Sequence, residues 1–389
     1  MQLIVMMGIV SLFGDITYEG ARSISGPYLA VLGASAGMVG LVAGTGEFLG
    51  YALRLVSGYL ADRSRAYWTL TFLGYGLICA IPLLALAGHW QSAALLLVAE
   101  RMGKGIRTPA RDTILSHATI QVGRGMGFGI HEALDQTGAV LGPLVFAAAF
   151  ALQGSYRQGF AWMWAPALLC LAVLFCARQK VPAPAALEKD QAPAADAQHS
   201  RLPRIFWTYS LFTFLSVAGF ASFQIMAYHF KVRAVLSAAQ IPVLYAVAMG
   251  VDAVVALITG RLYDRSGMKM LATVPLLTAP IPFLAFGSNI PAAVCSVILW
   301  GAVMGIHETV MRAALADLTP LSHRGRAYGI FNSIYGAGWF LGSTLMGLLY
   351  DQSITLLIIF AVACEAAAIP SLAALVRRKK FNGGINRKH

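Results

Sequence analysis

The chain has 389 residues, of which 58% are hydrophobic and only 12% are charged. A soluble domain averages about 25% charged residues, so this composition excludes an ordinary soluble globular protein. The formal net charge of +12 is spread over alternate loops and the C-terminal end, which follows the charge rule of membrane proteins, and we expect no nucleic-acid partner.

Apolar stretches of about 20 residues, each long enough to cross a bilayer as a helix, follow one another almost without pause. The first begins at Met1 and contains acidic and basic residues, which is unlike a cleavable signal peptide. The stretches lack the alternation of membrane β-barrel strands. We therefore predict an all-α membrane protein with twelve transmembrane helices, at residues 3–31, 36–61, 68–88, 91–116, 125–152, 158–177, 204–230, 239–263, 269–287, 291–317, 326–350 and 354–376.

Within the first predicted helix, Asp15, Glu19 and Arg22 lie within about 60° of one another around the helix axis and form one polar stripe. A charged side chain at the bilayer centre costs about 2.5–3.5 kcal/mol, so such residues are expected to face a cavity or to pair with one another. The second predicted helix adds Glu47 and Arg54, one heptad apart.

The fourth and fifth predicted helices carry further ionisable residues. In helix 91–116 the spacing i, i+4, i+7, i+11 predicts one charged face with Arg101 beside it, made by Glu100, Lys104, Arg107 and Arg111. In helix 125–152, His131 and Asp135 share a face with Gly138 and Gly142, and Glu132 lies to the side. The first half of the chain therefore holds most of the candidate functional residues.

Two interpretations of these charges remain open. Mutual neutralisation is enough to explain Glu47, Arg54, Arg107, Arg111 and Asp112, because buried ions are usually paired. The set that we predict to take part in proton coupling is Asp15, Glu19, Arg101, Glu132 and Asp135. Burial and a neighbouring guanidinium act in opposite directions on the proton affinity of a carboxylate, and a balance between them allows reversible protonation.

His131 has two interpretations of its own. An isolated histidine in a helix is usually a hydrogen-bonded packing residue. Beside Glu132 and Asp135, however, its imidazole could help to bind a divalent transition metal, because imidazole and carboxylate suit such ions. The same question arises for His307 and Glu308. The five cysteines lie inside apolar stretches without metal-ligand spacing, so we expect no cofactor.

Residues 178–203 separate the two halves of the chain. They contain prolines, alanines and mixed charges, a composition typical of a flexible linker. The predicted organisation is an N-terminal bundle at 1–177, the linker at 178–203, a C-terminal bundle at 204–376 and a basic tail at 377–389. Basic residues gather on the side of the linker and tail, which predicts cytoplasmic termini in an inner (cytoplasmic) membrane.

The second half has fewer charges. Its cavity-facing candidates, together with Arg22, Glu47, Lys104 and His131 from the first half, form the predicted substrate-binding set; they are Gln224, His229, Asn332, Tyr335 and Trp339. Aromatic residues at helical spacing are often packing residues instead. We hypothesise a cavity with one charged and one aromatic wall, which would suit an amphipathic or cationic organic substrate.

The two halves also repeat each other. Gly58–Ser64 (GYLADRS) returns as Gly260–Ser266 (GRLYDRS), each time at the end of an apolar stretch. Arg124–Ile130 (RGMGFGI) is matched by Arg324–Ile330 (RGRAYGI), at an offset of 324 − 124 = 200 residues. Similarity at a constant offset over several helices predicts two pseudo-symmetric six-helix bundles.

With these features the chain resembles the major facilitator superfamily over essentially its whole length. The family's signature turn is Gly-x-Leu-Ala-Asp-Arg-x-Gly-Arg-Lys. The first copy here has Arg65 and Ala66 where the family has Gly and Arg, and the second copy keeps Gly267 and Lys269. The resemblance implies that this turn latches the cytoplasmic face. The gating residues that it implies are Asp62, Arg63, Asp264 and Arg265.

Two further patterns are similar to those of proton-coupled efflux permeases. The segment Leu97-x3-Arg101-x2-Lys104-Gly105 is similar to the family's fourth-helix pattern, whose arginine is associated with proton coupling. The spacing of Gly129, Gly138 and Gly142-Pro143 matches the family's antiporter motif, which implies a gating role for Gly138, Gly142 and Pro143. In that fold the charged clusters of the first half converge on a central cavity.

The sequence thus predicts a proton-coupled exporter of a small organic solute, working by alternating access as a monomer in the lipid bilayer. One alternative is an exporter of divalent transition metals or metal chelates that uses His131 and nearby carboxylates. Another is a membrane receptor or channel that does not transport. An enzyme is not expected, because the sequence has no nucleotide loop, nucleophile elbow or zinc-protease pattern.

Overall fold

The computed structural model describes residues 1–119, 123–152, 154–183, 202–319 and 324–385. All regular secondary structure in these residues is helical. The first half comprises α1 (Gln2–Val31), α2 (Ala36–Ser64), α3 (Tyr67–Gly76), η1 (Leu77–Cys79), α4 (Ala80–Leu83), η2 (Leu84–Leu86), α5 (Trp90–Thr119), α6 (Arg124–Ala151), α7 (Tyr156–Trp162) and α8 (Trp164–Lys180).

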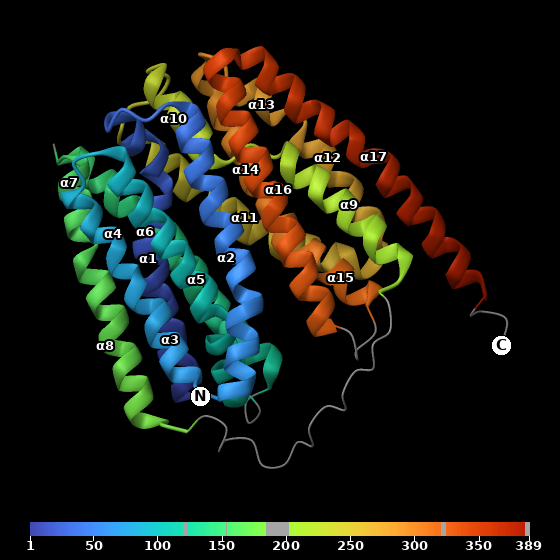
Figure 1. Ribbon diagram of the computed structural model, residues 1–389, viewed down its shortest axis with the longest axis horizontal. Coiled ribbons are helices and arrows are strands. Elements are labelled where there is room, and N and C mark those ends of the chain that lie inside the picture. Colours follow the sequence, from blue (N-terminus) through green and yellow to red (C-terminus); the bar gives the residue numbers. More distant parts are fainter. Residues whose placement is uncertain (120–122, 153, 184–201, 320–323, 386–389) are drawn as a thin grey trace.

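The second half repeats this pattern of long and broken helices. It comprises α9 (Arg204–Gly219), α10 (Phe223–Val232), α11 (Gln240–Ser266), η4 (Gly267–Ala272), α12 (Thr273–Thr278), α13 (Ile281–Ala285), α14 (Ile290–Ile306), the π-helical turn η5 (His307–Met311), α15 (Arg312–Leu318), α16 (Arg324–Gln352) and α17 (Ile354–Ile385). In Figure 1 the blue-to-green first half and the yellow-green-to-red second half lie side by side.

The helices confirm the twelve predicted membrane spans. Nine helical stretches of the described chain are long and apolar enough to cross a membrane, and one of them, Gln240–Ala285, has 46 residues and contains two spans that meet at Gly267. The remaining two spans are α5 and α16, with 30 and 29 residues. These two helices are long enough to cross a membrane but are not among the nine stretches. Helix α5 carries the cluster of charges that the sequence analysis placed in the fourth predicted span.

The predicted linker and the predicted basic tail lie partly outside the described residues. Most of the predicted linker, residues 184–201, lies outside the described residues. The last helix, α17, continues through residues 377–385 of the predicted basic tail, so this part of the tail is helical.

Both copies of the signature turn end at a residue with a positive φ, but their ψ values differ, 17° at Arg65 and −145° at Gly267. At the end of α2, Arg65 has a φ of 53°, and at the end of α11, Gly267 has a φ of 59°. Only glycine enters this left-handed region without steric cost; for other residues the cost is of order 1 kcal/mol. The two turns therefore differ in shape, because Arg65 lies in the left-handed helical region, whereas Gly267 has an extended ψ that at this φ only glycine readily adopts.

Helices α1 and α6 pack with almost no space between their backbones. A β-carbon at Gly138 or Gly142 would collide with the carbonyl groups of Leu12 or Ile16 on α1. The predicted gating glycines are therefore contact points that bring the ionisable residues of α1 and α6 together, as small residues do where membrane helices cross closely.

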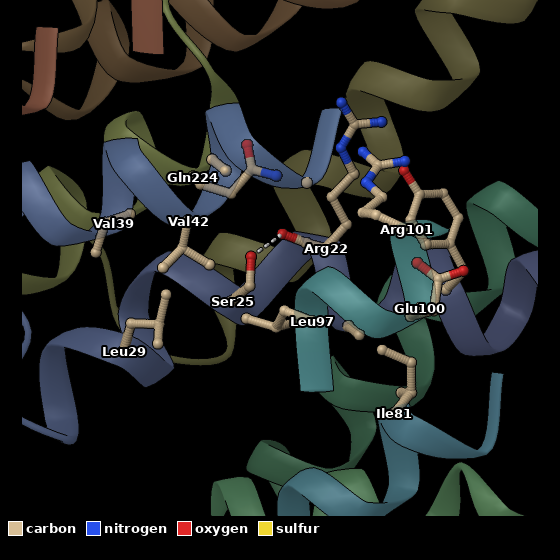
Figure 2. Close-up of a pocket in the computed structure, with 14 residues that line it drawn as sticks. Arg22, Ser25, Leu29, Val39, Val42, Ile81, Leu97, Glu100, Arg101 and Gln224 are labelled. Carbon is tan, nitrogen blue, oxygen red and sulfur yellow. Dashed lines mark hydrogen bonds between the residues drawn. The ribbon is translucent and has the colours of Figure 1, made fainter. Parts of the chain in front are cut away.

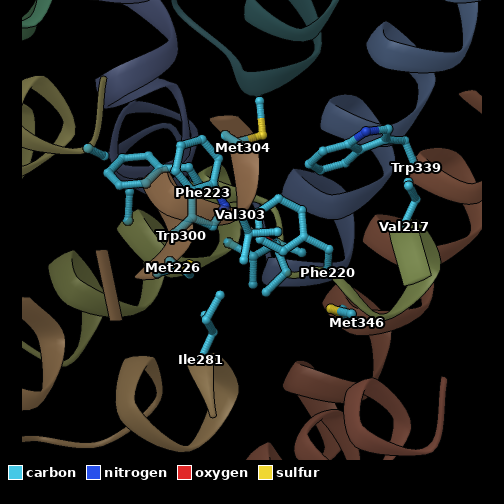
Figure 3. Packing of buried hydrophobic residues seen from close by; sticks show 14 of the residues in the cluster. Val217, Phe220, Phe223, Met226, Ile281, Trp300, Val303, Met304, Trp339 and Met346 are labelled. Carbon is cyan, nitrogen blue, oxygen red and sulfur yellow. Dashed lines mark hydrogen bonds between the residues drawn. The ribbon is translucent and has the colours of Figure 1, made fainter. Parts of the chain in front are cut away.

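The second half is held together by an aromatic core (Figure 3). Trp300 of α14 stacks on Phe220 at 5.7 Å and contacts Phe223 edge-on at 5.5 Å. Its indole N–H donates to the carbonyl of Ala221 at 3.0 Å, in the short break between α9 and α10. Because an unpaired carbonyl is costly inside a membrane, this bond stabilises the break and fixes the direction of α10.

Candidate functional site

A charged cavity of about 190 Å³ lies between the two halves. Helices α1, α2, α5 and α6 of the first half form most of its wall, and the second half contributes α14, η5 and α16. The lining residues are Tyr18, Glu19, Arg22, Glu47, Tyr51, Arg54, Arg101, Lys104, Thr108, Arg111, Asp112, Glu132, Asp135, Met304, Glu308, Tyr335 and Trp339.

A network of ion pairs connects three helices at the inner end of this cavity. Glu47 on α2 accepts hydrogen bonds from Arg22 on α1, at 3.1 Å, and from Arg101 on α5. Glu19 on α1 lies 3.7 Å from Arg22 and 3.9 Å from Lys104 on α5. The side chains of Glu19 and Glu47 are only 7% and 10% exposed, so each carboxylate depends on these cations for its compensation.

Aromatic rings support the same network. The Tyr18 ring lies under two cations, with the Arg101 guanidinium 4.5 Å and the Lys104 ammonium 4.0 Å from its centroid. Such contacts contribute about 0.5–2 kcal/mol each and hold a cation in place without neutralising it. Sequence inspection did not single out Tyr18, although its position one residue before Glu19 placed it in the first span.

One hydrogen bond crosses from one half to the other inside the network. The hydroxyl group of Tyr245, near the start of α11, donates to Glu19 at 2.6 Å, and both side chains are buried. Tyr245 packs against Phe223 at 4.5 Å between ring centroids, which fixes its direction. Glu19 therefore joins its cationic partners in the first half to a residue of the second half.

A second polar cluster lies farther along the cavity. Asp135 on α6 accepts a hydrogen bond from Ser11 on α1, and Arg111 on α5 donates to the same serine at 3.3 Å. Arg111 also pairs with Asp112 at 2.9 Å. The side chain of Asp112 is 46% exposed and Glu132 is exposed, so this end of the cavity is open to the surroundings.

The opposite end is closed by direct contact between the halves, which we call the closed end. The backbones of Gly26 and Gln224, and those of Gly40 and Ser343, are too close to admit a β-carbon at either glycine. In addition, the carboxylate of Asp351 on α16 accepts hydrogen bonds from the backbone N–H groups of α2, from Ala36 at 3.0 Å and from Gly37 at 2.7 Å.

A smaller cavity of about 40 Å³ lies between the network and the closed end (Figure 2). Arg22 and Arg101 point to one side of it, and apolar side chains from α1, α2 and α5 cover much of the rest. Gln224, predicted to bind substrate, lines this small cavity and not the larger one, and within the described residues its Oε1 has no hydrogen-bond partner.

The structure brings most of the predicted site residues to the large cavity, but not all. Asp15 is buried beside it, between α1 and α6, with its β-carbon against Gly138. His131 is buried and does not line the cavity, and neither does Asn332. His229 is a correction: its ring nitrogens bond Tyr350 at 2.9 Å and the Gly287 carbonyl at 3.0 Å, away from the cavity.

The predicted charged face of helix 91–116 is also corrected. Arg107 pairs with Glu100 at 3.5 Å, and its guanidinium stacks 4.7 Å from the Tyr75 ring of α3, so this pair faces away from the large cavity. The α5 residues that line it are Arg101, Lys104, Thr108 and Arg111. The packing of α3 against α5 determines which of two adjacent faces of α5 points toward the large cavity.

On the aromatic wall, Tyr335 and Trp339 line the large cavity as predicted. Tyr335 packs against Tyr51 of the other half at 4.9 Å, and its hydroxyl lies 3.5 Å from His307. The two signature turns lie at the open end, where Asp62, Arg63, Asp264 and Arg265 are all exposed. Residues 320–323 lie outside the described residues.

The metal alternative gains no support from the geometry. Within residues 1–119, 123–152, 154–183, 202–319 and 324–385, no three histidine, cysteine, aspartate or glutamate side chains are placed to hold a metal ion. His131 has no hydrogen-bond partner for its Nε2 in this part of the chain.

Comparison with known proteins gives matches along the whole chain. The family model of the Major Facilitator Superfamily matches residues 6–343 and 236–388. An uncharacterized protein of Mycobacterium tuberculosis is 42% identical over 379 residues, which cover 96% of this chain and 93% of that protein. An uncharacterized MFS-type transporter of Methanocaldococcus jannaschii is 28% identical over 361 residues, 90% and 88% of the two chains.

A shorter match is to a class H tetracycline resistance protein of Pasteurella multocida, 33% identical over 121 residues, or 31% of this chain and 30% of that one. Among solved structures, the nucleoside transporter NupG superposes with a TM-score of 0.73 at 14% identity, covering 97% of this chain and 99% of that one. A D-xylose-proton symporter gives 0.65 at 15% identity, covering 94% and 96%. These structural likenesses concern the fold alone.

Proposed function

The chain belongs to the Major Facilitator Superfamily of membrane transporters, and on that premise we propose that it is a proton-coupled exporter of a small organic solute. A transporter of this family binds its solute between two bundles and is not an enzyme. The observation that carries the proposal is the position of Glu19, which contacts cations of one half and Tyr245 of the other.

This position lets the charge of Glu19 control the closed end. A hydrogen bond from a tyrosine to an ionised carboxylate is worth about 1.5–3 kcal/mol, more than a bond between neutral groups. While Glu19 is ionised, the bond from Tyr245 holds the two halves together. When a proton neutralises Glu19, the bond weakens and the halves can separate at the closed end.

The control of the closed end by the charge of Glu19 also provides the coupling between solute and proton that an antiporter needs. An empty carrier with an ionised Glu19 stays closed at this end and does not turn over. In a carrier that holds a proton on Glu19, or a positively charged solute beside it in place of the Tyr245 hydroxyl, the bond between the halves is weakened and the closed end is released. Each crossing then moves a proton or a solute, so export of the solute is exchanged for proton entry.

Other features support export of the solute in exchange for protons, and further carboxylates are available for proton transfer. Asp135 and Glu132 lie toward the open end, between Glu19 and the surroundings, and suit a path for protons. The partial match to a tetracycline resistance protein supports export of an organic compound. The glycine spacing at Gly138, Gly142 and Pro143 supports antiport.

We further propose that the open end faces the cytoplasm of an inner membrane, with the linker and both termini on that side, because basic residues gather there. The two halves, residues 1–177 and 204–376, would be the two rocking units. A monomer contains the complete cavity.

The proposal is tested by measuring the closed end with spin labels at Met38 and Gln352, both exposed and on opposite halves. In liposomes, lowering the pH should lengthen the label distance. In Tyr245→Phe the bond to Glu19 is lost, so the open population should rise by about 10- to 100-fold at alkaline pH. A label distance independent of pH in the wild type would refute proton control.

A second prediction concerns Asp351, which caps α2 across the two halves. Asp351→Asn keeps one acceptor but loses the negative charge at the helix N-terminus, a loss of about 1 kcal/mol. The open population should rise about fivefold, measured with the same label pair, while its response to pH remains. The control is Gln91→Ala, at an exposed position on α5 that has no gating role, which should leave the distance unchanged.

A further inference from the structure

An opening of about 660 Å³ lies between α6 and α11, beside the charged cavity. Its size is in the range that accommodates drug-sized organic molecules. Small residues make up much of its lining, and a β-carbon at Gly129 would meet nothing within 4 Å. The lining residues are Gly129, Glu132, Ala133, Gln136, Ala253, Ala256, Leu257, Gly260, Glu308 and Thr309.

The depth and rim of this opening place it in the bilayer. Ala133 and Leu257 each lie nine residues from the nearer helix end, about 14 Å along the axis, inside a hydrocarbon core about 30 Å thick. The neighbouring exposed side chains are apolar: Leu257 is 66% exposed, and Val254 and Ile258 are 56% and 55% exposed. These residues fit contact with lipid.

On the other side of the molecule, the interface between α2 of the first half and α16 of the second half is closed. Helices α2 and α16 touch from the Asp351 cap to the contact of Leu55 with Gly329, which lies only five residues from the start of α16. Between these points, Tyr51 packs against Tyr335 at 4.9 Å. If the two halves only rocked apart, the α2–α16 interface and the α6–α11 interface would both be open at this depth. The gap between α6 and α11 is therefore separate from the general opening of the cavity.

The opening adjoins the charged cavity, and the two share Glu132 and Glu308 as lining residues. Among the described residues that line the opening, these two are the charged ones, and both are acidic. An apolar passage with carboxylates at its inner end favours a molecule that combines an apolar body with a positive charge. The aromatic wall of Tyr335 and Trp339 lies beyond them, in the cavity.

We infer that the solute is an amphipathic organic cation that enters the cavity from the membrane leaflet, through the opening between α6 and α11. This inference rests on the proposed proton-coupled transport and adds the chemical class of the solute and its route. The apolar body partitions into the leaflet, and the positive group is drawn to Glu132 and Glu308 and then to Glu19, where it replaces the Tyr245 hydroxyl.

The test uses tetraphenylphosphonium, an apolar cation, in proteoliposomes that have a pH gradient and a membrane potential clamped at zero. Ala133 is exposed and lines the opening, so Ala133→Trp fills it without entering the core. The protein-dependent transport rate should fall by about tenfold or more. Ala148→Trp, the same change at an exposed position on the same helix, should stay within about twofold.

Equal rates in Ala133→Trp and the wild type would overturn the route, and no transport of tetraphenylphosphonium above protein-free liposomes would overturn the solute class. If Ala133→Trp does not fold, Ala133→Cys in a chain without its five native cysteines is folded first and then blocked with a bulky thiol reagent. The reagent should reduce transport to the same extent, and unchanged transport would overturn the route.

The label pair at Met38 and Gln352 separates this inference from the proposed function. A pH-dependent distance in a protein that does not move tetraphenylphosphonium contradicts the inference only. A wild-type distance that ignores pH contradicts proton control itself. Ala133→Trp should keep the pH response, because the substitution lies outside the Glu19 network.

Discussion

Replacing Glu47 by glutamine is expected to destabilise the protein by about 3–5 kcal/mol, the usual cost of removing one partner from a buried ion pair. Glu47 is the carboxylate shared by Arg22 and Arg101, whose side chains are only 9% and 13% exposed. Its loss leaves two guanidinium groups with insufficient negative charge. The free energy of unfolding, or the thermal midpoint in detergent, is the measurement.

Two variants control this prediction. Glu47→Asp retains the charge and should recover part of the stability. Asp62→Asn removes an exposed acid and should change the free energy of unfolding by less than about 0.5 kcal/mol. Removing a cation as well, in Glu47→Gln with Arg101→Gln, should give a protein more stable than the single variant. If the double variant is less stable, repulsion between the arginines is not the cause.

Glu19→Gln is expected to abolish the effect of pH on the closed end. Glutamine keeps the size of glutamate but carries no charge that a proton can remove. Tyr245 then has only a neutral acceptor, so the closed end should open at every pH, as it does in the protonated wild type. The measurement is the Met38–Gln352 label distance over a pH series, with proton entry into liposomes as a second readout.

The matched control for Glu19→Gln is Asp112→Asn, an acid that lines the same cavity but whose side chain is 46% exposed. It should keep the pH response of the closed end. A full pH response in Glu19→Gln would contradict the role of Glu19. Asp135, which accepts a hydrogen bond from Ser11 and so joins α6 to α1, would then be the next candidate for the carboxylate that controls the closed end. The Asp135→Asn variant then gives the decisive comparison.

Much of the fold follows from local properties of the sequence. The length and apolarity of each stretch determine twelve spans, because a backbone in lipid must satisfy its hydrogen bonds within its own helix. The repeat of Gly58–Ser64 at Gly260–Ser266 indicates two related halves. The residues that end the two copies, Arg65 and Gly267, both have a positive φ.

The helix faces were harder to predict. Helical spacing correctly grouped Glu19 with Arg22, since they lie one turn apart on α1. The same argument grouped Arg107 with Lys104, but the packing of α3 against α5 drew Arg107 toward Tyr75 and away from the large cavity. When a helix has charges on most of its circumference, its periodicity does not identify the face that its neighbours leave open.

The sequence by itself determined the membrane character, the number of spans, the two repeated halves and the concentration of ionisable residues in the first half, because each depends on composition, periodicity or repetition along one segment. Only the tertiary structure decided that Tyr245 bonds Glu19, that Asp351 caps α2, that His229 lies away from the cavity and that α6 and α11 leave an opening. These features join residues more than fifty positions apart, and most of them depend on how the two halves meet, which no local pattern encodes.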